Sequence, residues 1–199
     1  MSATNRGAVR NEQDFYATPH AAFFPLLAYL SSCLCDLWWE PACGDGRLIQ
    51  WLEQALLPAA GEDLATGYDF LKDTNTHQGI VTNPPFSLAF EFCQHAVEHA
   101  DHVFLLLRLN FLASGKRREW FQAHEPSALI VLSDRPSFVM SCQCKNKFTC
   151  KHKWTLPMEA PRPDRCPKCG TMSPRITTSD ACDYAWYYWG QAHRGIHHL

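Results

Sequence analysis

A four-residue run, Asn83-Pro84-Pro85-Phe86, combines residue types that could act chemically on a planar amine. Two consecutive prolines restrict the backbone, so the Asn83 amide oxygen and the Pro84 carbonyl become fixed hydrogen-bond acceptors. An amine that donates one proton to each acceptor would direct its nitrogen lone pair out of the ring plane, toward an electrophile. Phe86 could stack against the ring that carries the amine. The alternative interpretation of this run is a rigid surface turn.

Residues 40–46 (EPACGDG) form a second candidate site, because they follow an apolar run and precede a segment with helical spacing. Small residues at such a turn let a ligand approach the backbone, and amides at a helix N-terminus favour a negatively charged group. A Gly-x-Gly turn alone is equally compatible with a structural role. Glu40 and Pro41, at the end of the expected strand, favour a binding loop.

Half of the ten cysteines lie within residues 142–169. The run Cys166-Pro-Lys-Cys169-Gly is typical of a zinc knuckle, whose turn places two thiolates on one ion. Four residues compete for the other two ligand positions: Cys142, Cys144, Cys150 and His152. Cys144 and Cys150 are the preferred pair, and the other two are alternates. Because nothing in the cluster requires the open coordination position of a catalytic zinc, we predict a structural zinc ion.

The cysteine cluster coincides with a basic segment. Residues 141–176 contain eight Lys/Arg and two Asp/Glu, a balance of +6, whereas the rest of the chain carries −8. This local excess of positive charge favours contact with nucleic acid, although a solvated basic loop around the zinc ion is the alternative. The residues that we expect to contact nucleic acid are Lys145, Lys147, Lys151 and Lys153, with Phe138 before them and the separate basic run Lys116, Arg117 and Arg118.

Alternating strand and helix patterns must position these residues. Helical spacing covers residues 20–30, 47–57, 88–100 and 116–124, and strand-like apolar runs cover residues 34–39, 79–82, 102–109, 128–133 and 184–189. This alternation predicts an α/β fold with a mainly parallel sheet and helices on both faces. The stretch after residue 141 breaks the rhythm. We therefore expect a core formed by residues 1–140 and 176–199, and a zinc-binding basic insertion at residues 141–175, before the last strand.

Composition supports a globular protein of one domain with a small added module. The 199 residues are 46% hydrophobic and 19% charged, and the longest apolar runs, residues 103–107 and 128–132, are far too short to span a membrane. The first fifteen residues contain no apolar stretch of the kind that signal peptides have. Clustered cysteines indicate metal binding more than a disulfide framework. We therefore expect a protein of the reducing cytoplasm without a membrane partner.

The two candidate motifs, in this order and spacing, resemble those of class I S-adenosylmethionine-dependent methyltransferases that act on exocyclic amines. Residues 14–19 (DFYATP) resemble the motif that precedes the glycine-rich loop in adenine-N6 methyltransferases. The resemblance is strongest to the small DNA adenine-N6 methyltransferases of phages and prophages. It continues through residues 69–71 (DFL), 106–112 (LLRLNFL) and 135–138 (RPSF). It covers most of residues 14–138 and the closing strand near residues 184–189, and implies a Rossmann-like fold.

The resemblance also implies roles for individual residues. Thr18 and residues 40–46 would bind the methionine part of S-adenosylmethionine, and Asp69 with Phe70 would contact its adenine. Asp63 is either a contact for the ribose or a solvated loop acid, because the connection between residues 57 and 69 is shorter than expected for this family. The residues predicted to bind the cofactor are Tyr16, Thr18, Pro19, Glu40, Ala42, Cys43, Gly44, Asp45, Asp69, Phe70 and Asn83. The predicted catalytic residues are Asn83, Pro84, Pro85 and Phe86.

The predicted reaction is methylation of the exocyclic N6 amine of adenine in DNA, on a base flipped out of the duplex. The same Asn-Pro-Pro-aromatic motif also serves methyltransferases that act on adenine in RNA or on a protein glutamine. Residues 14–19 and the basic insertion favour nucleic acid over a protein. A different class of function, a catalytically silent nucleic-acid-binding module built around the zinc knuckle, is disfavoured by the intact residues 40–46 and 83–86.

Overall fold

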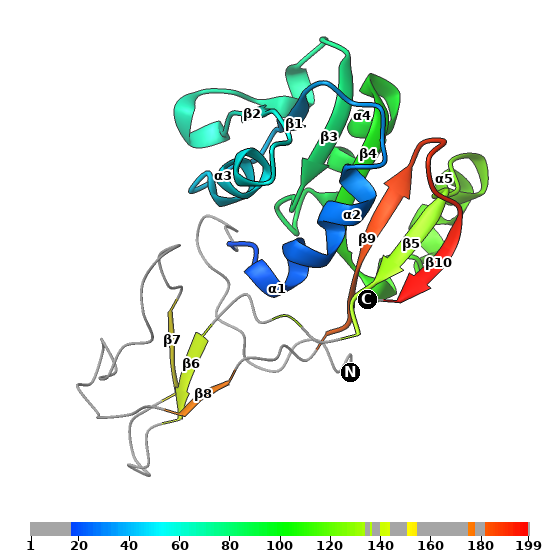
Figure 1. Ribbon diagram of the computed structural model, residues 1–199. Coiled ribbons are helices and arrows are strands. Elements are labelled where there is room, and N and C mark those ends of the chain that lie inside the picture. The colour runs from blue at the N-terminus through cyan, green and yellow to red at the C-terminus, as the bar shows by residue number, and fades with distance from the viewer. Residues whose placement is uncertain are drawn as a thin grey trace.

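The computed structural model describes residues 17–133, 136, 140–143, 151–154, 175–177 and 182–198 of the chain. Its centre is a seven-stranded sheet with the order β10-β5-β9-β4-β3-β1-β2 (Figure 1). The strands are β1 Trp38–Glu40, β2 Ala59–Gly61, β3 His77–Thr82, β4 Ala100–Arg108, β5 Ala128–Val131, β9 Tyr184–Trp189 and β10 Gly195–His198. All neighbouring pairs are parallel except those of β9, which runs antiparallel to both β4 and β5. The prediction of an α/β fold with a mainly parallel sheet is therefore confirmed.

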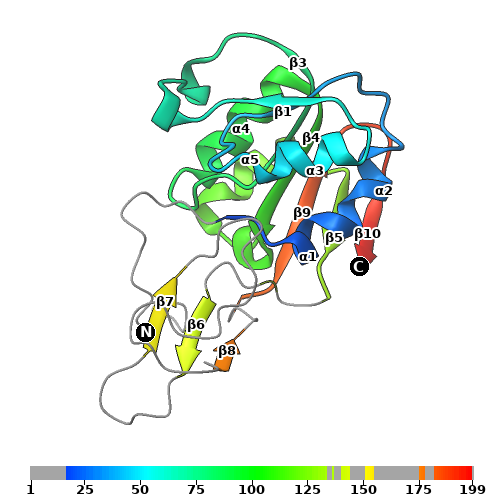
Figure 2. The ribbon, with the colours of Figure 1, turned by 60° about the vertical axis from the view of Figure 1, so that its left-hand side comes forward.

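Helices cover both faces of this sheet (Figure 2). The α-helices are α1 His20–Phe23, α2 Leu27–Leu30, α3 Arg47–Gln54, α4 Ala89–His99 and α5 Arg118–Ala123. Short 3₁₀ turns are η2 Phe24–Leu26, η3 Leu64–Thr66, η4 Phe70–Lys72, η5 Leu109–Phe111 and η6 Gly115–Arg117. One core cluster joins α1, α2 and α3 to one face, and the other joins α4 and η4 to the opposite face. β4 serves both, because successive side chains of a strand point to opposite faces: Phe104 lies in the first cluster and Leu105 in the second.

The structure differs from the sequence prediction at the sheet edges. β2 and β10 were not expected, since Ala-Ala-Gly and Gly-Ile-His-His carry no alternating apolar pattern. The first strand begins at Trp38 and not at Leu34, which is 96% exposed. The insertion was predicted to lie directly before the last strand. It lies before β9, and β10 is the last strand described. Pro25 lies in η2, midway along the segment predicted to be helical, where the helix tightens.

Three further strands lie between β5 and β9 in the sequence. β6 Met140–Gln143, β7 Lys151–Trp154 and β8 Arg175–Thr177 form an antiparallel sheet with the order β7-β6-β8. Both views show this small sheet apart from the seven-stranded one (Figures 1 and 2). The domain boundaries at residues 141 and 175 stay a prediction. Across the described ranges, no helix has the length and apolar character needed to cross a bilayer.

Candidate active site

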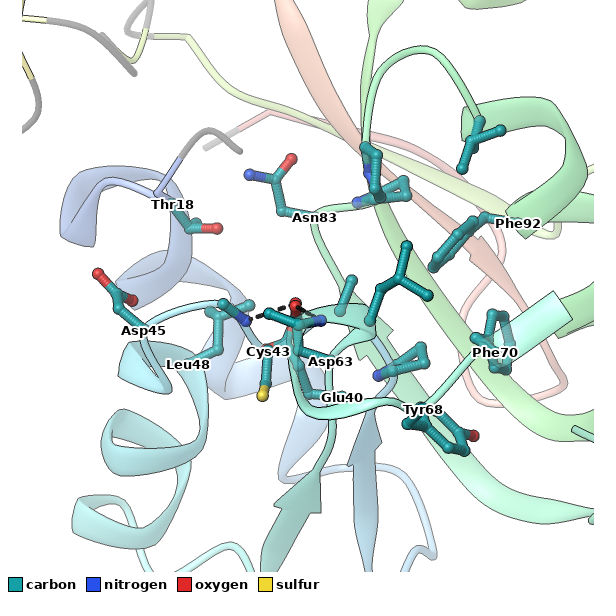
Figure 3. A pocket seen from close by; sticks show the side chains of 18 of the residues that line it. Thr18, Glu40, Cys43, Asp45, Leu48, Asp63, Tyr68, Phe70, Asn83 and Phe92 are labelled. Atoms are coloured by element: carbon teal, nitrogen blue, oxygen red, sulfur yellow. Dashed lines mark hydrogen bonds between the residues drawn. The ribbon is translucent and has the colours of Figure 1, made fainter. Parts of the chain in front are cut away.

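A cavity of about 610 Å³ opens at the carboxyl ends of β1 and β3 (Figure 3). β1 is followed by its neighbour β2 on one side and β3 by its neighbour β4 on the other, so the connections that leave the carboxyl ends of β1 and β3 diverge at this point. Ligands of open α/β sheets bind at such a switch point. The predicted site residues that line the cavity are Thr18, Glu40, Ala42, Cys43, Gly44, Asp45, Asp69, Phe70, Asn83, Pro84 and Pro85. Segments far apart in the sequence therefore meet around one space.

Glu40, the last residue of β1, is a buried acid in the cavity wall. It is 2% exposed, and its Oε2 atom has no hydrogen-bond partner among the described residues. Burial raises the pKa of Glu40 well above its usual range, against the opposing effect of the neighbouring Thr82 side chain and Asn83 backbone N–H. The carboxylates of Asp45 and Asp63 raise the pKa further. The unpartnered oxygen suits a ligand that brings a cationic N–H donor.

The loop after Glu40 is held by backbone contacts and by Asp63. Gly44 and Gly46 have φ values of +53° and +75°, in the left-handed region where glycine is favoured, and Gly46 is the N-cap of α3. The Gly44 N–H donates to Asp63 Oδ2 at 3.1 Å, and the Ala65 N–H donates to Asp63 Oδ1 at 2.9 Å. Asp63 is therefore not a solvated loop acid. Its carboxylate ties the glycine loop to η3 while it lines the cavity.

Arg47, the first residue of α3, was not predicted as part of the site. Its Nη1 atom donates to the Thr18 carbonyl at 3.2 Å, and its Nε atom donates to Asp45 Oδ1 at 2.9 Å. Arg47 thus ties the segment before α1 to the glycine loop. The sequence feature that could have indicated this role is the Asp-x-Arg spacing at the start of a helix. Thr18, Glu40, Asp45 and Asp63, with the loop between them, form what we call the polar end of the cavity.

The opposite side of the cavity is apolar and made largely of rings (Figure 3). Phe70 is buried in η4, and its ring centre lies 5.1 Å from that of Phe92 on α4. The Tyr68 hydroxyl donates to Asp73 and accepts from the Trp39 indole N–H at 3.2 Å, which fixes the Tyr68 ring. We call Tyr68, Phe70 and Phe92 the apolar end. Such an apolar surface suits a flat ring.

Asp69 lies beside the apolar end and is already engaged. Its Oδ1 atom accepts the Leu71 N–H at 3.2 Å as the N-cap of η4, and its Oδ2 atom pairs with Lys72 Nζ at 2.7 Å. The hydrogen bond from Lys72 lowers the pKa of Asp69. Both carboxylate oxygens of Asp69 therefore have a partner. The predicted contact with an adenine requires one of them to accept a second hydrogen bond. Sequence reasoning missed Tyr68 and Phe92, because a tyrosine in a turn and a phenylalanine at helical spacing indicate packing.

Asn83, Pro84 and Pro85 continue from β3 into the cavity wall, with Asn83 placed between the two ends (Figure 3). Pro84 is buried, and the Pro85 carbonyl accepts the Leu88 N–H at 3.0 Å just before α4. Phe86 is not among the lining residues. Its ring packs beside Tyr184 and beneath the Arg108 guanidinium.

The other predicted residues lie elsewhere or outside the described residues. Pro19, the N-cap of α1, is half-buried and does not line the cavity. Lys116 and Arg118 are exposed, whereas the Arg117 guanidinium donates to the Phe111 carbonyl at 2.8 Å and lies over its ring. Outside the described residues lie Tyr16, Phe138, Lys145, Lys147, Cys144, Cys150, Cys166 and Cys169.

Two alternate zinc ligands lie on described backbone. Cys142 of β6 and His152 of β7 are direct cross-strand partners, and the same strand β7 carries Lys151 and Lys153. In the part of the chain that the structure describes, no group of three or more His, Cys, Asp or Glu residues could hold a metal ion. The zinc site stays a prediction, because four of its six candidate ligands fall outside that part.

Comparison with solved structures finds methyltransferases. The methyltransferase subunit of a type I restriction-modification system from Streptococcus thermophilus matches 88% of this chain with a TM-score of 0.53 and 11% identity. The chain spans 45% of that subunit's length. A putative RNA methyltransferase from Pyrococcus horikoshii gives a TM-score of 0.40, 11% identity and coverage of 86% and 81% of the two chains. A precorrin-6y C5,15-methyltransferase from Geobacter metallireducens gives a TM-score of 0.40 and 10% identity, and the match covers 92% of this chain and 97% of that protein.

No family model matches the sequence, and no curated protein matches it. The likeness to the restriction-modification subunit concerns the fold. The fold is Rossmann-like, as predicted.

Proposed function

We propose that the protein transfers the methyl group of S-adenosylmethionine to the exocyclic N6 amine of adenine in DNA. The observation that carries this proposal is the shared cavity: Asn83, Pro84 and Pro85 line the same space as the polar end and the apolar end. A group that binds an amine therefore lies next to a pocket for a molecule with one charged and one ring-shaped end.

The cavity residues fit S-adenosylmethionine. Its ammonium group matches the buried Glu40 oxygen that has no partner among the described residues, and its carboxylate suits the amides at the start of α3. Its adenine ring suits the apolar surface that Phe70 and Phe92 present to the cavity. A volume of about 610 Å³ lies within the range of cofactor pockets. When bound, the cofactor would supply a methyl group on a positively charged sulfur.

The protein would contribute orientation and fixed dipoles. An exocyclic adenine amine is a weak nucleophile, because its lone pair is delocalised into the ring. Hydrogen bonds from its two N–H groups to Asn83 Oδ1 and the Pro84 carbonyl favour the pyramidal geometry in which the nitrogen lone pair attacks the methyl carbon. After transfer, the methylated nitrogen would lose one N–H proton to solvent. No side chain needs to remove a proton first, and the Asp45 and Asp63 carboxylates are held by hydrogen-bond donors of the chain itself. Positioning and preorganised dipoles would then supply most of the rate enhancement.

DNA is the favoured substrate for two reasons. Residues 14–19 and 83–86 resemble the motifs of DNA adenine methyltransferases, and residues 141–176 carry a charge of +6. The restriction-modification subunit that shares the fold is itself named a methyltransferase. A base in a duplex cannot reach this cavity, so the target would be flipped out, at a cost of a few kcal/mol.

The test is transfer of tritiated methyl groups from S-adenosylmethionine to DNA, RNA and protein, followed by nucleoside analysis. We expect label in N6-methyladenine of DNA. Label in RNA adenine alone, or in a protein amide, would replace the proposed substrate. Absence of transfer to all three, together with absence of cofactor binding by calorimetry, would indicate a catalytically silent nucleic-acid-binding module.

We further propose that residues 142–169 bind one structural zinc ion through Cys144, Cys150, Cys166 and Cys169. Tetrahedral coordination by two pairs of ligands is typical of such sites. Metal analysis of protein purified without added zinc should find about one zinc per chain. Cys166→Ser should release it while the seven-stranded core, which has its own apolar clusters, still binds the cofactor. Zinc-free wild-type protein would refute the site.

A further inference from the structure

A hydrogen-bond network lies behind the apolar end of the cavity, with Asp73 at its centre. Asp73 is the C-cap of η4, and its side chain is 6% exposed. Its Oδ2 atom accepts hydrogen bonds from the Tyr68 hydroxyl and, at 3.1 Å, from His77 Nε2. Its Oδ1 atom accepts from the backbone N–H and the side-chain amide of Asn75, at 3.0 and 2.6 Å. Both carboxylate oxygens therefore bind groups of the protein itself, and Asp73 is not among the residues that line the cavity.

The network reaches each segment that supplies a ring to the apolar end. Tyr68 precedes η4 and Phe70 is its first residue, so the Tyr68–Asp73 hydrogen bond links the chain before this turn to the chain after it. The Asp73 carbonyl accepts a hydrogen bond from His95 Nε2 at 2.8 Å, and the His95 and Phe70 rings pack edge to face with 4.8 Å between their centres. His95 lies on α4, as does Phe92. One aspartate thus connects Tyr68, the Phe70 turn and the helix that carries Phe92.

The Tyr68 hydroxyl is fully engaged as a donor in this network. It donates its only hydrogen to Asp73 and accepts the Trp39 indole N–H at 3.2 Å. The Trp39 ring stacks on the His77 ring, with 5.2 Å between the centres and 11° between the planes, so the second donor to Asp73 is held in place as well. Figure 3 shows the Tyr68 hydroxyl directed away from the polar end of the cavity. The Tyr68 side chain therefore offers a ligand ring surface but no hydrogen-bond donor.

The charge of Asp73 strengthens its hold on Tyr68. Burial acts to raise the pKa of Asp73, but hydrogen bonds from Tyr68, Asn75 and His77 outweigh burial and lower this pKa to about 2. The group is therefore a carboxylate at neutral pH. A hydrogen bond to an ionised acceptor is roughly twice as strong as one between neutral groups.

We propose that Asp73 is a positioning residue for the cofactor: its carboxylate holds the Tyr68 ring against η4, so that the apolar end is preformed for the adenine of S-adenosylmethionine. This inference rests on the proposed function, because it takes the apolar end as the place of the adenine. A preformed site binds more tightly, since the ligand does not have to order the side chains that it contacts.

The test compares ligand affinity, measured by calorimetry, with turnover on DNA. Asp73→Ala should weaken adenosine and S-adenosylmethionine by the same factor, about ten-fold, because charge-assisted hydrogen bonds are lost. Asp73→Asn keeps an acceptor oxygen but no charge, and it should weaken both ligands by about three-fold. The KM for S-adenosylmethionine should rise with these dissociation constants, whereas kcat at saturating cofactor and DNA should change less than about two-fold, since the groups that meet the target amine are untouched. The matched control is Asp36→Asn: Asp36 accepts a hydrogen bond from Gln78 at 3.2 Å outside the cavity lining, and the variant should bind both ligands as wild type does.

A double-mutant cycle with Tyr68→Phe shows whether Asp73 acts through the tyrosine. Tyr68→Phe keeps the ring and removes the hydroxyl, and in this background Asp73→Asn should cause no further loss of adenosine affinity. A full additional loss would overturn the proposal, as would wild-type affinity in Asp73→Ala. A fall in kcat as large as the fall in affinity would show a general loosening of the fold and would overturn it as well. A wild-type protein that binds neither ligand would refute the proposed function and this inference with it. If wild type binds the cofactor but methylates no DNA, the proposed function alone is refuted, and the affinities of the variants still decide the role of Asp73.

Discussion

At the polar end of the cavity, charged side chains are fixed by backbone amides and by one another, whereas at the apolar end rings pack on rings. Asp63 is held by the Gly44 and Ala65 amides, and Asp45 is held by Arg47. Phe70 and Phe92 pack on each other, and their side chains have no hydrogen-bond donors or acceptors. The polar end has one buried acceptor without a partner in the described structure, Glu40 Oε2. One end can therefore select a charge, and the other can hold a ring.

The largest effect is expected at Asn83, which lies between the two ends. Asn83→Ala should lower turnover by about 100- to 1000-fold, the usual result of removing one preorganised polar group that acts on the reacting atoms. Cofactor affinity should stay near wild type, because both ends remain intact. Steady-state kinetics and calorimetry check this, with Asn110→Ala, at an exposed asparagine, as the control. Near-wild-type turnover would remove Asn83 from the mechanism.

The second effect concerns Glu40 at the polar end, and it distinguishes a ligand with an ammonium group from one without. Glu40→Gln should weaken S-adenosylmethionine by about 10- to 100-fold, because a charge-assisted hydrogen bond is lost. Adenosine, which has no ammonium group, should bind the variant as it binds wild type. Calorimetric titration with both ligands measures this difference. Equal losses for the two ligands would show that Glu40 does not select the charge.

The third effect is a loss of affinity at the apolar end, and it should be smaller than the loss caused by Glu40→Gln. Phe92→Leu keeps an apolar side chain but removes the ring, and it should weaken both ligands by the same factor, about 2- to 10-fold. The same titrations apply. If only S-adenosylmethionine were weakened, the adenine would not occupy the apolar end.

The smallest effect concerns protons. The pKa of Glu40 is raised by burial, so the carboxyl of the free protein is protonated where an ordinary glutamate is ionised. A bound ammonium group favours the carboxylate, so cofactor binding should release up to one proton, and affinity should rise with pH. For the same reason, the free protein should lose stability as pH rises above the ordinary pKa of glutamate, because there the unfolded chain binds fewer protons than the native one. Calorimetry in two buffers of different ionisation enthalpy counts the protons, and Glu40→Gln should release none.

The two ends also differ in how far the sequence predicts them. Glu40 and Asp45 of the polar end follow from residues 40–46, because a binding loop that directly follows a strand is one contiguous sequence motif. Thr18 and Asp63 come from other segments and were predicted only through the resemblance. The apolar end is assembled from Tyr68, Phe70 and Phe92, which come from a turn, η4 and α4. Of these, only Phe70 was predicted, through its place beside Asp69. Phe92 has the spacing of any core residue of a helix, so only the fold shows that it also faces a cavity.

The roles of charged residues were harder to predict from the sequence than those of apolar residues. Arg117 stands in a basic run, yet its guanidinium is bound to the Phe111 carbonyl. Asp63 had two sequence interpretations, and the structure adds a third, as the tie between a loop and a turn. Sequence gives the charge of such a side chain but not its partner, since the partner depends on packing between distant segments.

The lengths of the strands have a consequence for the protein during synthesis and at high concentration. β4, at the centre of the seven-stranded sheet, has nine residues, whereas β2 and β10, at the two edges, have three and four. Long apolar strands with exposed edges are templates on which other chains add strands and aggregate. Here the long strand is enclosed on both sides, and the edges are too short, and at His197 and His198 too polar, to serve as good templates. The tapered sheet should therefore resist self-association through its edges.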